Sequence, residues 1–174
     1  MVFSNLIFLY LFLPVCLIAY FFCPGIRAKN AVLILFSLIF YAWGEPVYLL
    51  LMIASAAVNW GFGLLIERRR KKIFLILALV LDLGCLAVFK YAGFFVENLN
   101  AVFGASIPVP QIALPIGISF YTFQALSYTV DVWRGDVPAQ RSFAKLLLYI
   151  SLFPQLIAGP IVRYADVAGQ IDAR

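Results

Sequence analysis

The sequence has few charged residues and no histidine. Charged residues make up 12% of the 174 positions, whereas hydrophobic residues make up 65% and the mean hydropathy is +1.02. Ordinary soluble domains are about one-quarter charged, so a soluble chain of this length would lack polar residues to cover its surface. The composition therefore predicts an integral membrane protein. Without histidine, the chain also lacks the side chain whose unperturbed pKa best suits a general base near neutral pH.

Cysteine is also scarce. Cys16, Cys23 and Cys85 match no zinc or redox spacing, and an odd number of cysteines gives no disulfide framework. We expect them to be small buried apolar residues, and we expect no metal site. The first 22 residues lack the basic segment and the small-residue cleavage site of a signal peptide, so they predict a retained first helix.

The net charge of +5 could indicate nucleic-acid binding, but the placement of the charges argues against it. The block Arg68–Lys72 stands between two apolar runs, as a cytoplasmic loop of a membrane protein would. No basic stripe alternates with aromatic residues. The expected partner of these charges is the lipid bilayer and its anionic headgroups, not nucleic acid.

Uncharged runs predict the membrane helices, because a spanning helix needs about 20 mostly apolar residues. The candidate runs are 1–26, 30–44, 47–66, 73–96 and 112–133. They predict an all-α, polytopic transmembrane helix bundle of about five to six membrane segments. Residues 1–174 are expected to belong to a single multi-spanning domain.

The basic clusters predict the orientation. If Arg27, Lys29 and the block at 68–72 all lie in the cytoplasm, the first helix runs inward and the N-terminus lies outside. The later basic residues fall on the cytoplasmic side in the same scheme: Arg134, Arg141 and Lys145.

Prolines interrupt the second half of the chain. Residues 98–130 carry no charge, but Pro108, Pro110 and Pro115 are incompatible with one straight helix. We predict a short interfacial segment at about 94–104, an irregular turn, and a helix from about Pro115.

Polar residues gather on one face of the helix expected at 114–135. Gln124, Tyr128 and Asp131 are spaced i, i+4, i+7 and share a face. In a membrane helix such groups point into a bundle or a wet cavity, or they hydrogen-bond neighbouring helices as packing contacts. Asp131 has a further alternative, because it lies near the helix end and could be solvated or paired with Arg134.

Asp82 and Lys90 lie within one expected membrane helix, two turns apart and too far from each other to pair. Lys90 is near the end of the helix, so its long side chain can extend to the membrane surface. Asp82 is near the middle and cannot. It is a candidate either for a cavity or for a buried structural hydrogen bond.

The stretch SLFPQLIAGPIVRY at 151–164 is apolar, yet it is built to interrupt a helix. Pro154 and Pro160 each remove a backbone donor, and they bracket Gln155 and Gly159. A bilayer offers no water to freed backbone groups, so they need protein or a cavity around them. The stretch predicts a broken membrane segment, which either lines a pathway or forms a structural kink or re-entrant turn.

Two long motifs closely resemble the membrane-bound O-acyltransferase family: LPIGISFYTFQALSYTVDVWRG at 114–135 and FAKLLLYISLFPQLIAGPIVRY at 143–164. The most similar branch contains alginate O-acetyltransferase and the teichoic-acid D-alanyl transfer protein. Two shorter motifs resemble the N-terminal part of the same branch: FYAWGEP at 40–46 and FKYAGFF at 89–95. The resemblance therefore extends over almost the whole chain.

The resemblance implies a ring of membrane helices around a tunnel, through which an acyl group passes from a cytoplasmic donor to an extracellular acceptor. It implies acetyl-CoA or another acyl donor as co-substrate, with no bound cofactor. It also implies a polysaccharide acceptor such as alginate and an extracytoplasmic hydrolase-like partner that completes the transfer. The expected location is the bacterial inner membrane, crossed several times.

By the same resemblance, Gln155 and Arg163 are expected to meet substrate or donor. Gln124, Tyr128 and Asp131 would be supporting polar groups, and none of the five is expected to be catalytic. The histidine that is central to catalysis in this family has no counterpart here, since the sequence contains none. We therefore expect the chain to be the N-terminal portion of a longer enzyme, or a degenerate or regulatory short form, and to be inactive alone.

Two other classes of protein fit the same pattern of residues. Broken helices with polar faces also build the substrate pathways of transporters and channels, so the chain could be a fragment of one. It could also be a non-catalytic membrane scaffold.

The predicted orientation can be tested by cysteine labelling in intact cells. A membrane-impermeant thiol reagent is expected to modify Val2→Cys from outside and to leave Arg70→Cys unmodified, because the basic block stays in the cytoplasm. Modification of position 70 from the outside would contradict this topology.

Overall fold

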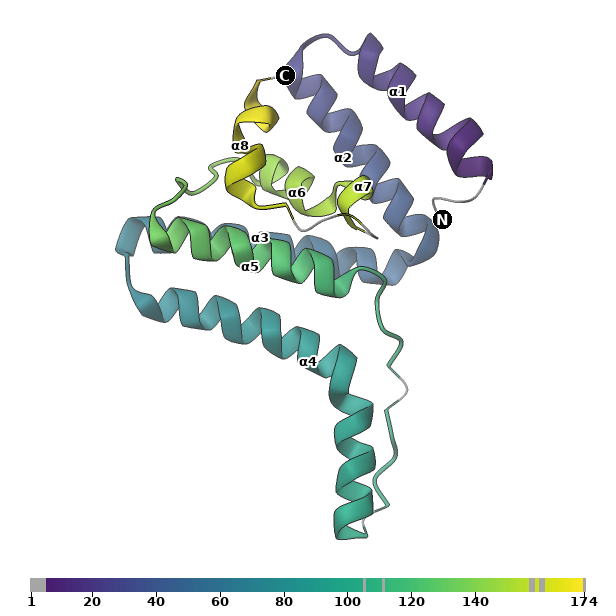
Figure 1. Ribbon diagram of the computed structural model, residues 1–174, viewed down its shortest axis with the longest axis vertical. Helices are drawn as coiled ribbons and strands as arrows, with labels where there is room; N and C mark the ends of the chain where they lie inside the picture. Colours follow the sequence, from purple (N-terminus) through teal and green to yellow (C-terminus); the bar gives the residue numbers. More distant parts are fainter. Residues whose placement is uncertain (1–5, 105, 111, 157–158, 160–161, 174) are drawn as a thin grey trace.

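The computed structural model describes residues 6–104, 106–110, 112–156, 159 and 162–173, and these residues form helices and connecting segments without a β-strand. The elements, in chain order, are a π-helical turn Phe8–Phe12 and the helices α1 Leu13–Phe22, α2 Gly25–Gly44, α3 Pro46–Arg69, α4 Lys72–Phe103, α5 Ile118–Arg134, α6 Phe143–Ser151, α7 Phe153–Leu156 and α8 Tyr164–Asp172 (Figure 1). The all-α prediction is confirmed.

Three helices are long and apolar enough to cross a membrane by length and composition: α2, α3 and α4, with 20, 24 and 32 residues. The apolar stretch Phe8–Phe22 is shorter. α5 has only 17 residues, and most of its surface is buried by its neighbours. The predicted number of five to six membrane segments therefore stays a prediction.

Prolines mark the first helix boundaries. Glu45 has a non-helical backbone with φ −145° and ψ 75°, and Pro46 begins α3, as expected for the residue before a proline and for a proline in the first turn. Pro14 lies at the start of α1, directly after the π-helical turn. The wider turn accommodates the proline ring, which clashes with the carbonyl one turn back in an ordinary α-helix.

The second helix begins earlier than the uncharged run at 30–44 predicts. Arg27 and Lys29 lie within α2, which begins at Gly25. Two of the three free cysteines, Cys23 and Cys85, are only half-buried, whereas Cys16 is buried as expected.

α3 and α5 lie side by side and run in the same direction (Figure 1). At their beginnings, the backbone N–H of Ile116 donates to Glu45 Oε2 at 2.9 Å. In the middle, the Thr129 hydroxyl donates to Asn59 Oδ1 at 2.8 Å. At their ends, the N–H of Ala139 donates to Glu67 Oε1 at 2.9 Å. The two helices therefore stay in register along their full length.

This arrangement brings the basic clusters to one end of the bundle. Glu67, beside the 68–72 block, pairs with Arg141 at 2.5 Å. The start of α2 meets the start of α6 around a cavity of about 380 Å³ whose lining includes Arg27 and Lys145. The three clusters thus share a side, as the predicted topology requires, and the assignment of that side to the cytoplasm stays a prediction.

The start predicted for the short interfacial segment at about 94–104 is wrong, because these residues continue α4 through Phe103. Its position at the membrane interface stays a prediction. No proline removes a backbone donor within α4, and the helix ends where Gly104 adopts φ +63°. The second half of α4 turns sharply away from α3 and α5, and the chain returns beside it (Figure 1). α5 begins at Ile118 rather than at Pro115, because Gly117 takes the left-handed conformation with φ +77° just before it.

The chain is interrupted between α6 and α8, which confirms a broken segment over the described part of 151–164. Its freed backbone groups find partners on other elements. The N–H of Phe153 donates to Ser37 Oγ in α2 at 3.3 Å, and the Tyr149 hydroxyl donates to the carbonyl of Val162 at 2.7 Å. Pro160 lies outside the described residues.

Replacement of Ser37 by alanine is expected to destabilise the protein by about 1–3 kcal/mol, because it leaves the buried N–H of Phe153 without an acceptor. Thermal unfolding in detergent measures the effect. Ser151→Ala is the matched control, since Ser151 is equally buried and its hydroxyl has no partner among the described residues. Equal melting temperatures for the two variants would contradict a role of Ser37 in holding the break.

Candidate functional site

The polar face of α5 meets the broken segment through two side-chain pairs. Gln124 Nε2 donates to Gln155 Oε1 at 3.2 Å. Seven residues along α5, Asp131 accepts a hydrogen bond from Arg163 at 2.5 Å. The structure thus joins four of the five predicted site residues in two contacts between segments about 30 residues apart in sequence.

Asp131 pairs with Arg163, so the alternative pairing with Arg134 is wrong. The Asp131 side chain is 4% exposed and the Arg163 side chain 52%, which makes the pair a buried carboxylate closed by a half-exposed guanidinium. Arg163 also lies 3.6 Å from Asp136, and Arg134 pairs with Asp136 instead, at 3.4 Å. The helix ends at Arg134, and Gly135 caps it in the left-handed conformation with φ +84°.

Tyr128 points toward α3 rather than toward Gln155. Its hydroxyl accepts the backbone N–H of Gln140 at 3.0 Å, and a Cβ placed on Gly63 would lie 2.5 Å from that hydroxyl. Gly63 therefore leaves room for the ring, whose edge-to-face partner is Tyr164 at 5.0 Å between centroids. Tyr128 therefore packs between α3 and α8, and its supporting role at the site stays a prediction.

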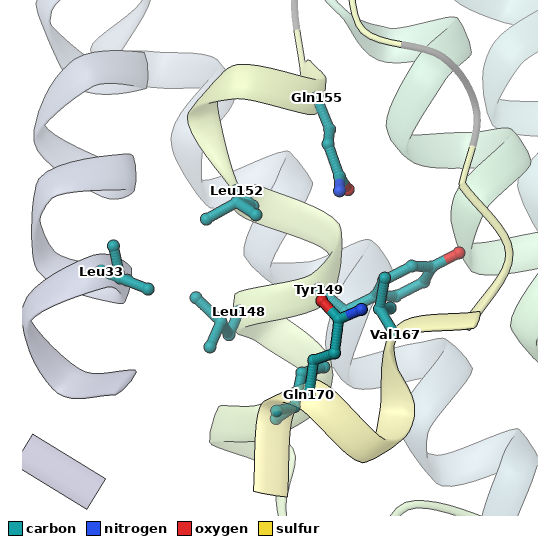
Figure 2. A pocket seen from close by; sticks show the side chains of 8 residues that line it. Leu33, Leu148, Tyr149, Leu152, Gln155, Val167 and Gln170 are labelled. Carbon is teal, nitrogen blue, oxygen red and sulfur yellow. The ribbon is translucent and has the colours of Figure 1, made fainter. Parts of the chain in front are cut away.

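A cavity of about 90 Å³ lies beside the broken segment. Its lining comes from α2, α6, the break and α8: Leu33, Leu148, Tyr149, Leu152, Gln155, Val167, Gln170 and Ile171. Figure 2 shows the Gln155 amide pointing into the space between Leu152 and Gln170, with leucine side chains along one wall. The cavity therefore has an apolar wall and an amide-bearing wall.

Two glycines allow the broken segment to come this close. A Cβ on Gly117 would lie 2.8 Å from the carbonyl oxygen of Leu156, the last residue of α7. A Cβ on Gly159 would lie 2.6 Å from Cα of Gln155, so the chain folds tightly back on itself there. Both contacts are shorter than real Cβ contacts, and both involve backbone that cannot move aside easily.

A second buried polar cluster ties α3, α4 and α5 together. Asn59 Nδ2 donates to Asp82 Oδ1 at 3.0 Å, and Asn59 Oδ1 accepts from Thr129. Asp82 also lines a cavity of about 160 Å³ with Tyr121 and Thr122, so both sequence alternatives for Asp82 are realised together. Asn59 was missed in the sequence, although a lone amide in the apolar run of α3 is a signal of this kind.

The described residues contain no group of histidine, cysteine, aspartate and glutamate side chains that could hold a metal ion. The side chains that meet at the site carry amides, hydroxyls and one buried ion pair. Such groups can bind and orient a polar ligand within apolar surroundings.

Comparison with known proteins places this arrangement in context. The whole chain aligns at 43% identity with the probable alginate O-acetylase AlgI of Pseudomonas aeruginosa and at 42% with that of Azotobacter vinelandii. The chain is a homologue of the alginate O-acetylases. It is also 31% identical over 203 residues, with 98% of this chain covered, to a peptidoglycan O-acetyltransferase of Helicobacter pylori.

The alginate O-acetylase homologue spans about a third of the length of these relatives, namely 35%, 36% and 38%. No protein-family model matches it, and no solved structure does. The resemblance to membrane-bound O-acyltransferases that the motifs indicated is confirmed by these relatives.

Loss of the Arg163 side chain is expected to lower the melting temperature of the protein, because the buried Asp131 carboxylate is left without its partner, at a cost reduced by the exposure of Arg163. Arg163→Gln is the variant, and thermal unfolding in detergent is the measurement. Adding Asp131→Asn to Arg163→Gln should recover part of the loss.

Arg134→Gln is the matched control, since its pair with Asp136 is exposed and should change stability by less than about 1 kcal/mol. A double variant that is less stable than Arg163→Gln alone would show that the pair does not hold the segment as described.

Proposed function

We propose that this chain forms the part of a membrane O-acetyltransferase that binds the acetyl group on its way to an extracytoplasmic polysaccharide. The observation that carries the proposal is the pair of contacts that fasten the broken segment to α5, which places Gln155 at the cavity. The names of the relatives, alginate and peptidoglycan O-acetyltransferases, support acetyl as the group and a polysaccharide as the acceptor.

The size of the cavity supports a small acyl group. A water molecule needs about 10–15 Å³ of the same kind of volume, so about 90 Å³ has room for a few heavy atoms. An acetyl group fits this space, whereas a long acyl chain or a whole coenzyme A does not. We propose that acetyl-CoA is the donor, that its nucleotide stays outside this cavity, and that Gln155 hydrogen-bonds the acetyl carbonyl.

Arg163 is the proposed second contact to donor or substrate. Its guanidinium is half exposed while it holds Asp131, so donors remain available to an anionic or carbonyl group that approaches from solvent. Gln124, Tyr128 and Asp131 hold these two residues in place. No proton-transfer step is assigned within the chain, because none of its 174 residues is histidine.

We further propose that the protein is a multi-pass component of the bacterial inner membrane, with the basic end of the bundle in the cytoplasm. The opposite end then faces the compartment that holds the polysaccharide. An extracytoplasmic hydrolase-like acyltransferase is the proposed partner that receives the acetyl group there. The shared side of the three basic clusters supports this orientation.

The proposal predicts a specific effect of Gln155→Met, which keeps the length of the side chain and removes the amide. In bacteria that carry this gene as the sole copy, O-acetyl content of the exported polysaccharide is expected to fall about tenfold, as for loss of one hydrogen bond of about 1.4 kcal/mol. Membrane preparations with labelled acetyl-CoA should show the same loss of transfer.

Arg134→Gln is the control with an unchanged site and should keep full acetylation. The amount of each variant in the membrane and its melting temperature are measured in parallel, so that misfolding is recognised. Wild-type acetylation by a stably inserted Gln155→Met protein would contradict the role of Gln155. Polysaccharide without acetyl groups in the wild-type strain would instead favour a transporter or scaffold.

A further inference from the structure

Helix α4 is longer than a membrane crossing requires. A straight helix of 32 residues would be about 48 Å long, whereas the hydrocarbon core is about 30 Å thick. The part from Lys72 to Phe89 provides about 27 Å at 1.5 Å per residue, close to the thickness of the core, so the last turns of α4 extend beyond what a crossing needs. Residues 91–103 and the described part of the returning segment 104–117 form what we call the arm.

The arm leaves the bundle at the end opposite the basic clusters. Its root is fixed at Tyr48, near the start of α3, whose ring meets Phe89 edge to face at 5.8 Å between centroids. The hydroxyl of Tyr48 donates to the carbonyl of Ala113 at 2.9 Å, which fastens the returning segment at the same place. From there the arm extends across the direction of α3 and α5 (Figure 1).

One side of the arm is bound to its own chain. Asn100 Nδ2 donates to the carbonyl of Ile107 at 2.8 Å, and the N–H of Ile107 donates to Asn100 Oδ1 at 3.0 Å. A Cβ on Gly93 would lie 3.8 Å from Cγ1 of Val109 and 3.8 Å from the carbonyl oxygen of Pro110. The returning segment therefore covers the face of α4 that carries Gly93 and Asn100.

The other side of the arm is apolar and uncovered by the described residues. Phe95, Leu99, Val102 and Phe103 are spaced i, i+4, i+7, i+8, so they share one face, and they are 60%, 44%, 75% and 75% exposed. Exposed apolar patches of this kind mark contact with a membrane or another protein.

We propose that the arm lies flat in the membrane–water interface on the side opposite the basic clusters, with this apolar face among the lipid headgroups and upper acyl chains. A helix that runs along the surface and carries aromatic and aliphatic residues on one face suits that position. Next to the start of the arm, Nζ of Lys90 lies 5.5 Å from the centroid of the Tyr91 ring. Lysine and tyrosine both favour the membrane–water interface.

Lipid fits this face better than a protein partner does, because of its position. The root of the arm is fixed beside the start of α3, one of the three helices long and apolar enough to cross a bilayer, which puts the arm at the level of the membrane surface. Glu97 argues against a second crossing by the arm, because an exposed carboxylate in the hydrocarbon core would lose its hydration. The proposal depends on insertion in a membrane and is independent of acetyl transfer.

The depth of single fluorophores tests the proposal. The protein, with Cys16, Cys23 and Cys85 replaced by alanine, carries either Leu99→Cys or the matched control Glu97→Cys, two positions apart on opposite sides of the arm. Each is labelled with the environment-sensitive dye NBD in phosphatidylcholine vesicles that contain lipid with a nitroxide near the headgroup or deep in the acyl chain. The label at 99 is expected to be quenched by the shallow nitroxide about twofold more than the label at 97.

Three results would overturn the proposal. Quenching at position 99 by aqueous iodide and by neither nitroxide would place the arm in water. Protection from all quenchers would show that protein covers the face, and strongest quenching by the deep nitroxide would show that the arm crosses the bilayer.

A second measurement covers the case in which the cysteine-free protein does not fold. Benzoylphenylalanine at position 103, in the otherwise unchanged chain, is irradiated in native membranes. Cross-linking to phospholipid supports the proposal, whereas cross-linking only to protein overturns it. Normal acetylation by the same cells would leave the proposed function standing in either case.

Discussion

In the interior of a bilayer the polar side chains of Gln124, Thr129 and Asp131 find no water, so they need hydrogen-bond partners from neighbouring elements. Asn59 of α3 accepts a hydrogen bond from Thr129, and it donates one to the carboxylate of Asp82 in α4. In the broken segment, Gln155 hydrogen-bonds Gln124, and Arg163 hydrogen-bonds Asp131. The packing order around α5 therefore follows from where its polar groups lie.

The same requirement explains how a helix break persists among apolar helices. The break is held by polar contacts on one side, from Ser37 and Tyr149 to freed backbone groups. On its other side, the ring of Phe153 lies within 6.0 Å, between centroids, of Phe8, Phe12 and Phe40. Because the break is fixed from two directions, it can hold Gln155 at one place beside a cavity, as a binding site requires.

Most helices could be predicted from the sequence, because the length of an uncharged run and the charges beside it determine locally whether a segment can form a membrane helix. Uncharged runs, the Glu45-Pro46 break and the interruption after residue 151 predicted helices and boundaries that the structure contains. The continuity of residues 94–103 with α4 could not be predicted. Sequence shows where a helix must stop, as at a proline, but it does not show that α4 bends and continues when no residue forbids it.

The sequence by itself determined that the protein is helical and suited to a membrane, that one face of α5 is polar and that residues 151–164 interrupt a helix. It also contained the motifs of an acyltransferase. Only the tertiary structure decided which polar groups meet: Asp131 takes Arg163 rather than its near neighbour Arg134, and Asp82 takes Asn59. The pairing of buried groups depends on which helices pack against each other. The spacing of residues within one helix shows which groups share a face, but it does not show which other helix that face contacts.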